Sequence, residues 1–305
     1  MIDPLAEVVT LLQPGARFSK LVYGASPWRV SRSDAGQPFY CVILEGGCRI
    51  AIDGHEPIEL LSGDFVLIPA AYGVAMSSLE PPPPAVETIA PVALGNGEFR
   101  IGAPESPIDT RMVVGHCSFG SPDASLLVSL LPQLVHVRGE QRLATLVQLV
   151  REETREQLPA REVVLSRLLE VLLIEALRST AQTSASQGLV RGLSDGRLAA
   201  AIRGMHEHPT RAWTVAELAK EAALSRSTFF ERFSRTVGIA PMQYLLTWRM
   251  ALAKDLLRRR EGRIAEIAQR VGYSSASTFS VAFTRHVGRP PTQYAREEQT
   301  VASGA

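Results

Sequence analysis

The chain has 305 residues, of which 46% are hydrophobic and 21% charged, and its formal net charge is +1. This length suffices for two domains with sizeable cores. No run approaches the roughly 18 apolar residues that a membrane span needs. The N-terminus also lacks the basic segment and long apolar stretch of a secretory signal. We therefore expect a cytoplasmic protein that neither crosses nor contacts a membrane.

Charge is distributed unevenly along the chain. Residues 1–192 carry 15 basic and 21 acidic side chains, whereas residues 193–305 carry 17 basic and 10 acidic ones. An acidic front and a basic back are typical of a protein in which one domain alone meets phosphates. The three cysteines, Cys41, Cys48 and Cys117, form no ligand-spaced pair, which predicts packed, reduced thiols.

Residues from about Arg17 to Phe119 have the pattern of short β-strands separated by tight turns. Runs rich in β-forming residues are bounded by Gly, Pro and Asp-Gly signals. Many short strands with this punctuation are typical of a small barrel or sandwich, so we expect a barrel over about residues 17–119. The expected strands include Phe39–Leu44, Cys48–Asp53, Pro57–Leu60, Phe65–Ile68 and Met112–Phe119.

After Pro122 the apolar residues change to helical spacing. They predict two helices, around Leu143–Val150 and Val164–Leu177, split near Leu158-Pro159. Their apolar stripes fit packing on the barrel and fit a dimer seam equally well. The small polar residues of Ser179–Gly192 predict a flexible linker. The expected domains are residues 1–185, with helices over about 123–180, and residues 193–298, which are helical throughout.

An internal duplication occupies the C-terminal third. The segments that start at Ala216 and Ala265 align with a single gap, and after it the matching residues are 50 positions apart. So many matches at a constant spacing do not arise by chance, so the two segments are copies of one unit. Matching pairs include Ser225 and Ser275, Phe229 and Phe279, Phe233 and Phe283, Gly238 and Gly288, and Tyr244 and Tyr294.

Each copy predicts a helix, a tight turn and a second helix. Thr214 and Glu217 have the spacing of a capping box at the first helix, and a small residue or Gly272 occupies the turn. Ser225 and Ser275 stand at N-cap positions of the second helices. The residues of their outward faces are short and mostly uncharged, so these faces could enter a major groove without clashing. The helix-turn-helix units are expected over 214–237 and 264–287. A plain helical bundle is the alternative.

Residues 216–294 resemble the DNA-binding domain of the AraC family of bacterial regulators. The resemblance rests on the capped first helix, the Ser-x3-Phe-x3-Phe pattern, the linking segment from Trp248 and the closing GRPPTQY. It implies that two recognition helices read double-stranded promoter DNA and that a linking helix joins them. The implied base-reading residues are Ser227, Phe230, Glu231, Ser277, Ser280 and Val281, and the candidate phosphate contacts are Arg226, Arg232, Arg249 and Arg285.

Two positions depart from the family pattern. Members often carry arginine where this chain has Glu231 and Val281, and arginine there would bind guanine through two hydrogen bonds. The family's base preferences are therefore not transferred to this chain. Arg226 and Arg232 are near enough in sequence to compensate or to bind phosphate. Phe230 and Val281 could instead touch thymine methyl groups.

Residues from about Pro38 to Phe119 resemble the cupin-type sensory barrel that precedes this DNA-binding domain in one AraC subgroup. The stretch FYCVILEGGCRIAIDGHEPIELLSGDFVLIP carries the resemblance. Catalytic cupins hold a metal with about two or three histidines and a glutamate, whereas the barrel sequence offers only His55 and His116. We therefore expect no catalytic residue, metal or cofactor. Candidate effector-pocket residues are Trp28, Tyr40 and His116.

The expected fold is α+β with two domains: an N-terminal cupin-like β-barrel with a helical appendage, and a C-terminal all-α tandem helix-turn-helix. The leading hypothesis is a transcription regulator whose barrel senses a small molecule and controls promoter binding. Further expected partners are a second copy of the chain and, for an activator, RNA polymerase. The alternatives are a ligand-independent architectural DNA binder and a cupin enzyme with a DNA-binding tail.

Overall fold

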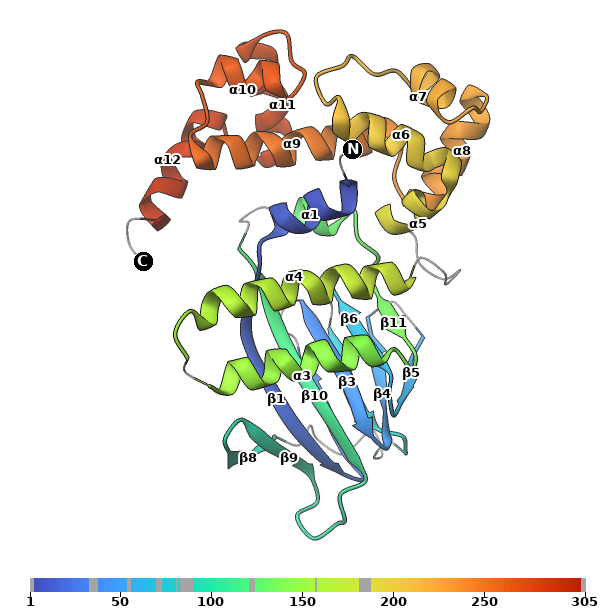
Figure 1. The fold of residues 1–305 in the computed structure, drawn as a ribbon, viewed down its shortest axis with the longest axis vertical. Coiled ribbons are helices and arrows are strands. Elements are labelled where there is room, and N and C mark those ends of the chain that lie inside the picture. Colours follow the sequence, from blue (N-terminus) through green and yellow to red (C-terminus); the bar gives the residue numbers. More distant parts are fainter. Residues whose placement is uncertain are drawn as a thin grey trace. The chain divides into compact units, whose positions relative to one another are not determined.

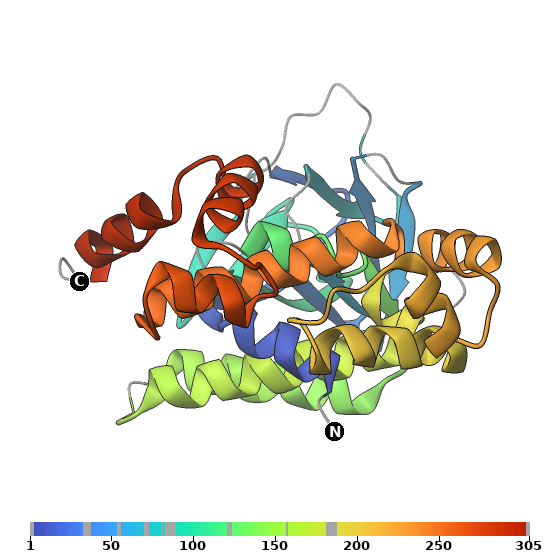
Figure 2. The same ribbon diagram turned by 90° about the horizontal axis from the view of Figure 1, so that it is seen from above.

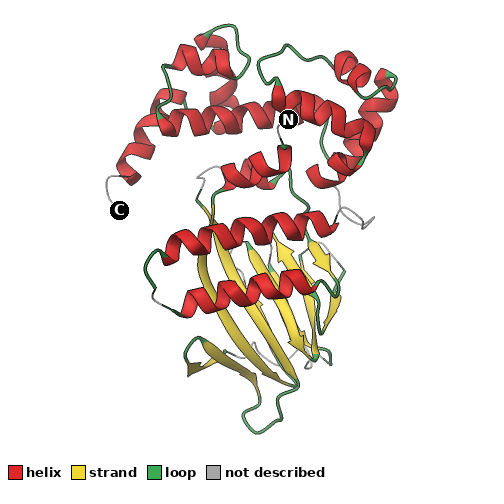
Figure 3. Cartoon of the chain, viewed as in Figure 1, coloured by secondary structure: helices red, strands yellow, loops and turns green. Residues whose placement is uncertain are grey.

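The computed structural model describes residues 3–32, 38–53, 56–69, 73–80, 82, 90–120, 124–156, 158–180 and 188–302 (Figure 1). Contacts divide the chain into two compact units. One, the strand unit, comprises Leu12–Pro122 and Pro132–Ser186. The other, the helical unit, combines Met1–Leu11, Asp123–Leu131 and Gln187–Ala305. Every strand described belongs to the strand unit, whereas the helical unit contains helices and loops only (Figure 3).

The strands pair into two sheets. The larger has seven strands in the order β11-β6-β3-β10-β1-β9-β8, and the smaller has four in the order β2-β7-β4-β5. All five expected strands are confirmed within a residue or two at their ends. The strands are β1 (Pro14–Ala25), β2 (Arg29–Arg32), β3 (Phe39–Glu45), β4 (Gly47–Ile52), β5 (Ile58–Leu61), β6 (Phe65–Ile68), β7 (Val74–Ser78), β8 (Val92–Gly95), β9 (Glu98–Gly102), β10 (Thr110–Phe119) and β11 (Val135–Val137).

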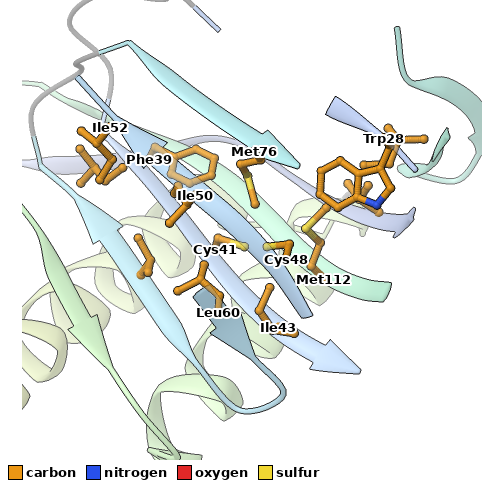
Figure 4. Close-up of a cluster of buried hydrophobic side chains, with 14 residues drawn as sticks. Trp28, Phe39, Cys41, Ile43, Cys48, Ile50, Ile52, Leu60, Met76 and Met112 are labelled. Carbon is orange, nitrogen blue, oxygen red and sulfur yellow. The ribbon is translucent and has the colours of Figure 1, made fainter. Parts of the chain in front are cut away.

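The core of the strand unit draws apolar side chains from both sheets (Figure 4). Side chains alternate between the two faces of a strand, so Phe39, Cys41 and Ile43 of β3 enter this core. Cys48, Ile50 and Ile52 contribute from β4 of the smaller sheet. The core side of the seven-stranded sheet is therefore mostly covered by hydrocarbon and sulfur groups.

Two helices cover the opposite face of the seven-stranded sheet (Figure 1). They are α3 (Gln141–Arg155) and α4 (Arg161–Thr180), and the break between them confirms the split predicted near Leu158-Pro159. The apolar stripe of α4 is buried, with Leu165, Leu169, Leu172 and Leu173 at most 5% exposed. This stripe packs on the chain's own sheet, one of the two roles that its sequence allowed.

The helical unit contains more than the C-terminal third. It includes α1 (Pro4–Leu12) and α2 (Ala124–Val128), which the sequence placed with the barrel. The predicted linker is partly helical, because α4 runs to Thr180 and α5 begins at Leu189, which is fully buried; residues 181–187 lie outside the described part. The remaining helices are α5 (Leu189–Ser194), α6 (Gly196–Glu207), α7 (Val215–Glu221), α8 (Arg226–Val237), α9 (Pro241–Arg259), α10 (Ile264–Arg270), α11 (Ala276–Val287) and α12 (Pro291–Ala302).

Among the described residues, no helix combines the length and the apolar character needed to cross a membrane.

Candidate nucleic-acid interface

The first helix of each copy starts with its backbone N–H groups capped. Before α7, the Thr214 hydroxyl accepts from the N–H of Glu217 at 3.2 Å, and the Glu217 carboxylate accepts from the N–H of Thr214 at 2.8 Å. This confirms the predicted capping box. Before α10, Glu266 accepts from the N–H of Arg263 at 2.9 Å. The second copy thus keeps only the carboxylate half of the arrangement, because arginine has no acceptor to complete it.

The tight turn between the two helices has the same backbone geometry in both copies. Its central residue is left-handed, with φ of 50° at Ala223 and 84° at Gly272. The next N–H closes the turn, from Leu224 to the Ala219 carbonyl at 2.9 Å and from Tyr273 to the Ala268 carbonyl at 2.8 Å. The duplication read from side chains therefore extends to the main chain, although one copy uses alanine where glycine fits without strain.

The second helices, α8 and α11, are built alike. Their N-cap hydroxyls accept from the N–H three residues on, Ser225 from Thr228 at 3.2 Å and Ser275 from Thr278 at 3.1 Å. Each then buries two phenylalanine rings completely and ends at a glycine in the left-handed conformation. The buried rings are Phe229 and Phe233 in α8, and Phe279 and Phe283 in α11.

Helix α9 belongs to both copies. Tyr244, fully buried near its start, packs edge-on against Phe233 of the first copy with ring centroids 5.8 Å apart. Further along, Met250, Ala253 and Leu257 enter the core around α10 and α11. Seen from above, α9 runs between the two helix-turn-helix pairs (Figure 2). A continuous helix that contributes to both cores fixes the two pairs relative to each other.

The structure places the base-reading candidates on the outward faces of α8 and α11. Ser227, Glu231 and Ser277 are exposed, and Phe230 and Val281 are large apolar side chains exposed by 45% and 70%. Ser280 differs, because it is half-buried and its hydroxyl donates to the Ala276 carbonyl at 2.7 Å. The Ser280 hydroxyl hydrogen is therefore already used in a hydrogen bond within α11.

The four arginines predicted to contact phosphate fall into two pairs. Arg226 and Arg285 are exposed near the start of α8 and the end of α11. Arg232 instead donates to the Asp195 carboxylate at 2.6 Å. Arg249 donates to the carbonyls of Pro209 and Arg211 at 2.8 and 2.7 Å, and burial lowers the pKa of its guanidinium. Arg232 and Arg249 thus hold the helical unit together.

Asp195 carries two of these structural roles at once. Its carboxylate accepts from the N–H groups of Arg197 and Leu198 at the start of α6 and pairs with Arg232. Burial alone would raise the pKa of Asp195, but the hydrogen bond from Arg232 and those from the two N–H groups outweigh it and lower the pKa. No local pattern announces this pair, since its partners are 37 residues apart.

A buried polar cluster joins α1 to α6 and α9 (Figure 1). His206 of α6 is 2% exposed and stacks on Trp248 with ring centroids 4.0 Å apart. Its Nδ1 lies 2.8 Å from the Glu7 carboxylate and its Nε2 lies 2.8 Å from the Tyr244 hydroxyl. A carboxylate only accepts, so Nδ1–H donates to Glu7 and the Nε2 of a neutral ring accepts from Tyr244. No local sequence pattern indicates this cluster, because Glu7 and His206 are 199 residues apart.

The three effector-pocket candidates do not meet in one pocket. Trp28 lies in the core between the sheets beside Met112 (Figure 4), and His116 packs edge-on against the core residue Phe39 with ring centroids 5.4 Å apart. Tyr40 is on the other face of β3. It lines a small apolar cavity beneath α4, together with Pro14, Leu67, Cys117, Phe119, Leu169, Leu172 and Leu173.

The described side chains of the strand unit do not form a metal centre. Within the described part of the chain, no three His, Cys, Asp or Glu side chains come together, and His55 lies outside that part. The three cysteines are buried free thiols, and burial raises the pKa of Cys48 and Cys117 to about 12. A protonated buried thiol is a poor nucleophile and a poor metal ligand. Cys41 and Cys48 lie in the apolar core between the sheets, and Cys117 lines the apolar cavity beneath α4.

Both domains of the chain are similar to known protein families. A cupin family matches residues 3–182 and a helix-turn-helix domain family matches residues 218–297. Together they define a DNA-binding transcription regulator with a cupin-like domain. Putative AraC-like transcription regulators of Streptomyces lividans and Streptomyces antibioticus are 34% and 35% identical over 301 and 303 residues, with 96% of this chain and 98% of each relative covered. The chain belongs to the AraC-like transcription regulators.

A solved structure is similar to the C-terminal part alone. The DNA-binding domain of AdpA, determined in complex with a target DNA, is 31% identical to this chain. The match has a TM-score of 0.33 and covers 35% of this chain and 96% of that domain. The expected α+β fold, with a cupin-like domain before a tandem helix-turn-helix, is confirmed.

Proposed function

We propose that this regulator inserts α8 and α11 into successive major grooves of promoter DNA, under the control of a small molecule sensed by its cupin-like domain. The observation that carries the proposal is the repeated geometry of two capped helices, each with a buried phenylalanine face and an exposed opposite face. Grooves one helical turn apart are separated by about 34 Å, and a shared helix such as α9 can hold two readers at a fixed separation.

Base contacts come from the exposed side chains of both helices, and phosphate contacts come from basic residues beside them. The base-reading set is Ser227, Phe230, Glu231, Ser277 and Val281, with Ser280 contributing through its carbon atoms. Arg226 and Arg285 are the phosphate contacts, since they are exposed, whereas Arg232 and Arg249 bond within the chain.

The effector site that the strand unit supports best is the apolar cavity beneath α4. The core between the sheets is built from apolar side chains. The cavity beside Tyr40 and Cys117 is small, with room for about one water-sized group, so an effector enters it only if the lining leucines of α4 move. Its lining is almost entirely apolar, so a small apolar molecule fits its chemistry. A thermal-shift series of small hydrocarbons on the wild type and on Leu172→Trp tests this site, because only the wild type should be stabilised.

The remaining functional assignments follow from this role. The protein acts on DNA in the cytoplasm without catalysing a reaction, and it binds as a homodimer. It contacts RNA polymerase if it activates transcription. Sedimentation of the full chain with and without its operator measures the oligomeric state.

Footprinting of the full chain on genomic fragments tests the central proposal. We expect protection of a defined sequence and a binding constant that falls with salt. Arg226→Gln and Arg285→Gln should each reduce the slope of log binding constant against log salt by about one. Arg49→Gln is the matched control, because that exposed arginine pairs with Glu59 in the strand unit. Equal affinity for random and genomic DNA would instead identify an architectural binder.

A further inference from the structure

The outward faces of α8 and α11 present unlike chemistry at equivalent positions. Val281 occupies in α11 the place of Glu231 in α8, because the two copies are offset by 50 residues. Each lies two residues from both buried phenylalanines of its helix, which at 3.6 residues per turn places it on the far side from the core. Val281 is 70% exposed, the largest fraction among the exposed large apolar side chains described.

The hydroxyl groups of α11 nearest Val281 already have hydrogen-bond partners in the helix or at its N-cap. The Ser280 hydroxyl donates to the Ala276 carbonyl and the Thr284 hydroxyl to the Ser280 carbonyl, both at 2.7 Å. The Ser277 hydroxyl lies 3.0 Å from that of Ser275, within hydrogen-bond distance. The most exposed large apolar group on the outward face of α11 is therefore the isopropyl group of Val281.

The face of α8 has a different composition. Phe230 is 45% exposed, and the Glu231 carboxylate beside it is exposed and accepts hydrogen bonds without being able to donate them. A carboxylate in a DNA groove is repelled by the phosphates. Its presence is favourable only where a base donates to it, and in the major groove the cytosine N4 amino group does so.

Neither position can read guanine. The major-groove edge of guanine offers the acceptors N7 and O6, which need a donor, whereas thymine offers an apolar methyl group and cytosine an amino donor. We propose that Val281 selects a thymine through its 5-methyl group and that Glu231 selects a cytosine through N4. This inference rests on the proposed placement of α8 and α11 in the major groove, and it assigns a different base to each half of the site.

The test starts from selection of random duplexes by the full-length protein. In the best duplex, each thymine is then replaced by deoxyuridine, which lacks only the 5-methyl group. We expect one replacement to weaken wild-type binding about fourfold, the effect of one buried methyl-sized group. Val281→Ala should bind the thymine and deoxyuridine duplexes equally. Because Val281 is exposed, this variant leaves the core unchanged.

Glu231→Gln provides the reciprocal arm. Glutamine pairs with adenine N6 and N7, so the selected base at one position should change from cytosine to adenine. The half of the site that depends on Val281 should stay unchanged, and each variant thereby controls for the other. Removing one negative charge should also raise affinity for random DNA.

The outcomes separate the two levels of the proposal. If the wild type selects no sequence, the proposed function fails. If it selects a motif in which no deoxyuridine replacement matters, or in which Val281→Ala keeps the full thymine preference, the assignment of Val281 is overturned while DNA reading stands. Retention of cytosine by Glu231→Gln overturns the assignment of Glu231 in the same way.

Discussion

Removal of the Glu7 carboxylate should destabilise the helical unit, although Glu7 lies near the start of the chain. In Glu7→Ala the buried Nδ1–H of His206 loses its acceptor at 2.8 Å. His206 has a side chain that is 0% exposed, whereas that of Glu7 is 31% exposed, so water replaces the carboxylate only in part. Loss of a hydrogen bond to a charged group costs about 1.5–3 kcal/mol, and we expect about 2 kcal/mol here.

Thermal and urea unfolding of the full chain at pH 7.5 measure this cost. Glu7→Gln keeps an acceptor oxygen and should lose less than half as much. Glu59→Ala is the surface control, because its side chain is 56% exposed in a pair with Arg49 and such pairs contribute at most about 1 kcal/mol. A Glu7→Ala protein as stable as Glu59→Ala would refute the reasoning.

The same variant should also be more sensitive to acid. Burial lowers the pKa of His206, and the contacts with Glu7 oppose that effect. The folded state therefore favours the neutral ring, so this contribution to stability is complete above the unfolded pKa of about 6.5 and is lost as the pH falls towards the lowered folded value. Without Glu7 the pKa falls further. Glu7→Ala should lose more stability than wild type between pH 7.5 and 5.5, and equal losses would contradict this account.

Four further variants test backbone geometry, helix capping and side-chain packing. Ala223→Gly should raise the free energy of unfolding by about 0.5 kcal/mol, because relief of the left-handed strain at φ 50° exceeds the entropy cost of glycine. Gly272→Ala should lower the free energy of unfolding by about 2 kcal/mol, because at φ 84° its Cβ would lie 2.7 Å from a backbone carbonyl oxygen. Urea titration compares both, and equal effects would refute the assigned geometry. Asp195→Ala should lower the free energy of unfolding by about 1 kcal/mol at pH 7, because it removes the N-cap of α6. This difference from wild type should shrink as the pH falls towards the lowered pKa of Asp195, and unfolding curves recorded from pH 7 downwards measure it. Gly115→Ala should destabilise the strand unit by about 2 kcal/mol, because its Cβ would meet the Tyr40 ring at 2.0 Å; an unchanged melting temperature would show that the ring can move away.

Local patterns predicted the two helix-turn-helix units well. Caps, turns and the spacing of Phe229 and Phe233 depend on residues within four positions of one another, so their signals can be read directly from the sequence. The confirmed box at Thr214 and the N-caps at Ser225 and Ser275 are of this kind. The short strands were found for the same reason, because turn residues bound each of them.

Features that depend on distant parts of the chain were not predictable in this way. Arg232 and Arg249 were predicted to contact phosphate, and the partners that they bond within the chain lie 37 to 40 residues away. Tyr40 and His116 were both predicted to line one pocket, but they lie on opposite faces of the larger sheet. The face on which each lies depends on the strand register, which the sequence does not show. The Glu7–His206 contact spans 199 residues and has no local signature.

The mixed membership of the helical unit has a consequence for protein engineering and for recombination between relatives. A chimera that exchanges only the residues after the predicted linker would pair the incoming α6 and α9 with a foreign α1 and α2. The residue at position 206 of the incoming part would then face a residue at position 7 from a different parent protein, so the contact between Glu7 and His206 would not be preserved. Exchanges at that junction should yield folded, regulated hybrids only when residues 1–11 and 123–131 travel with the C-terminal part.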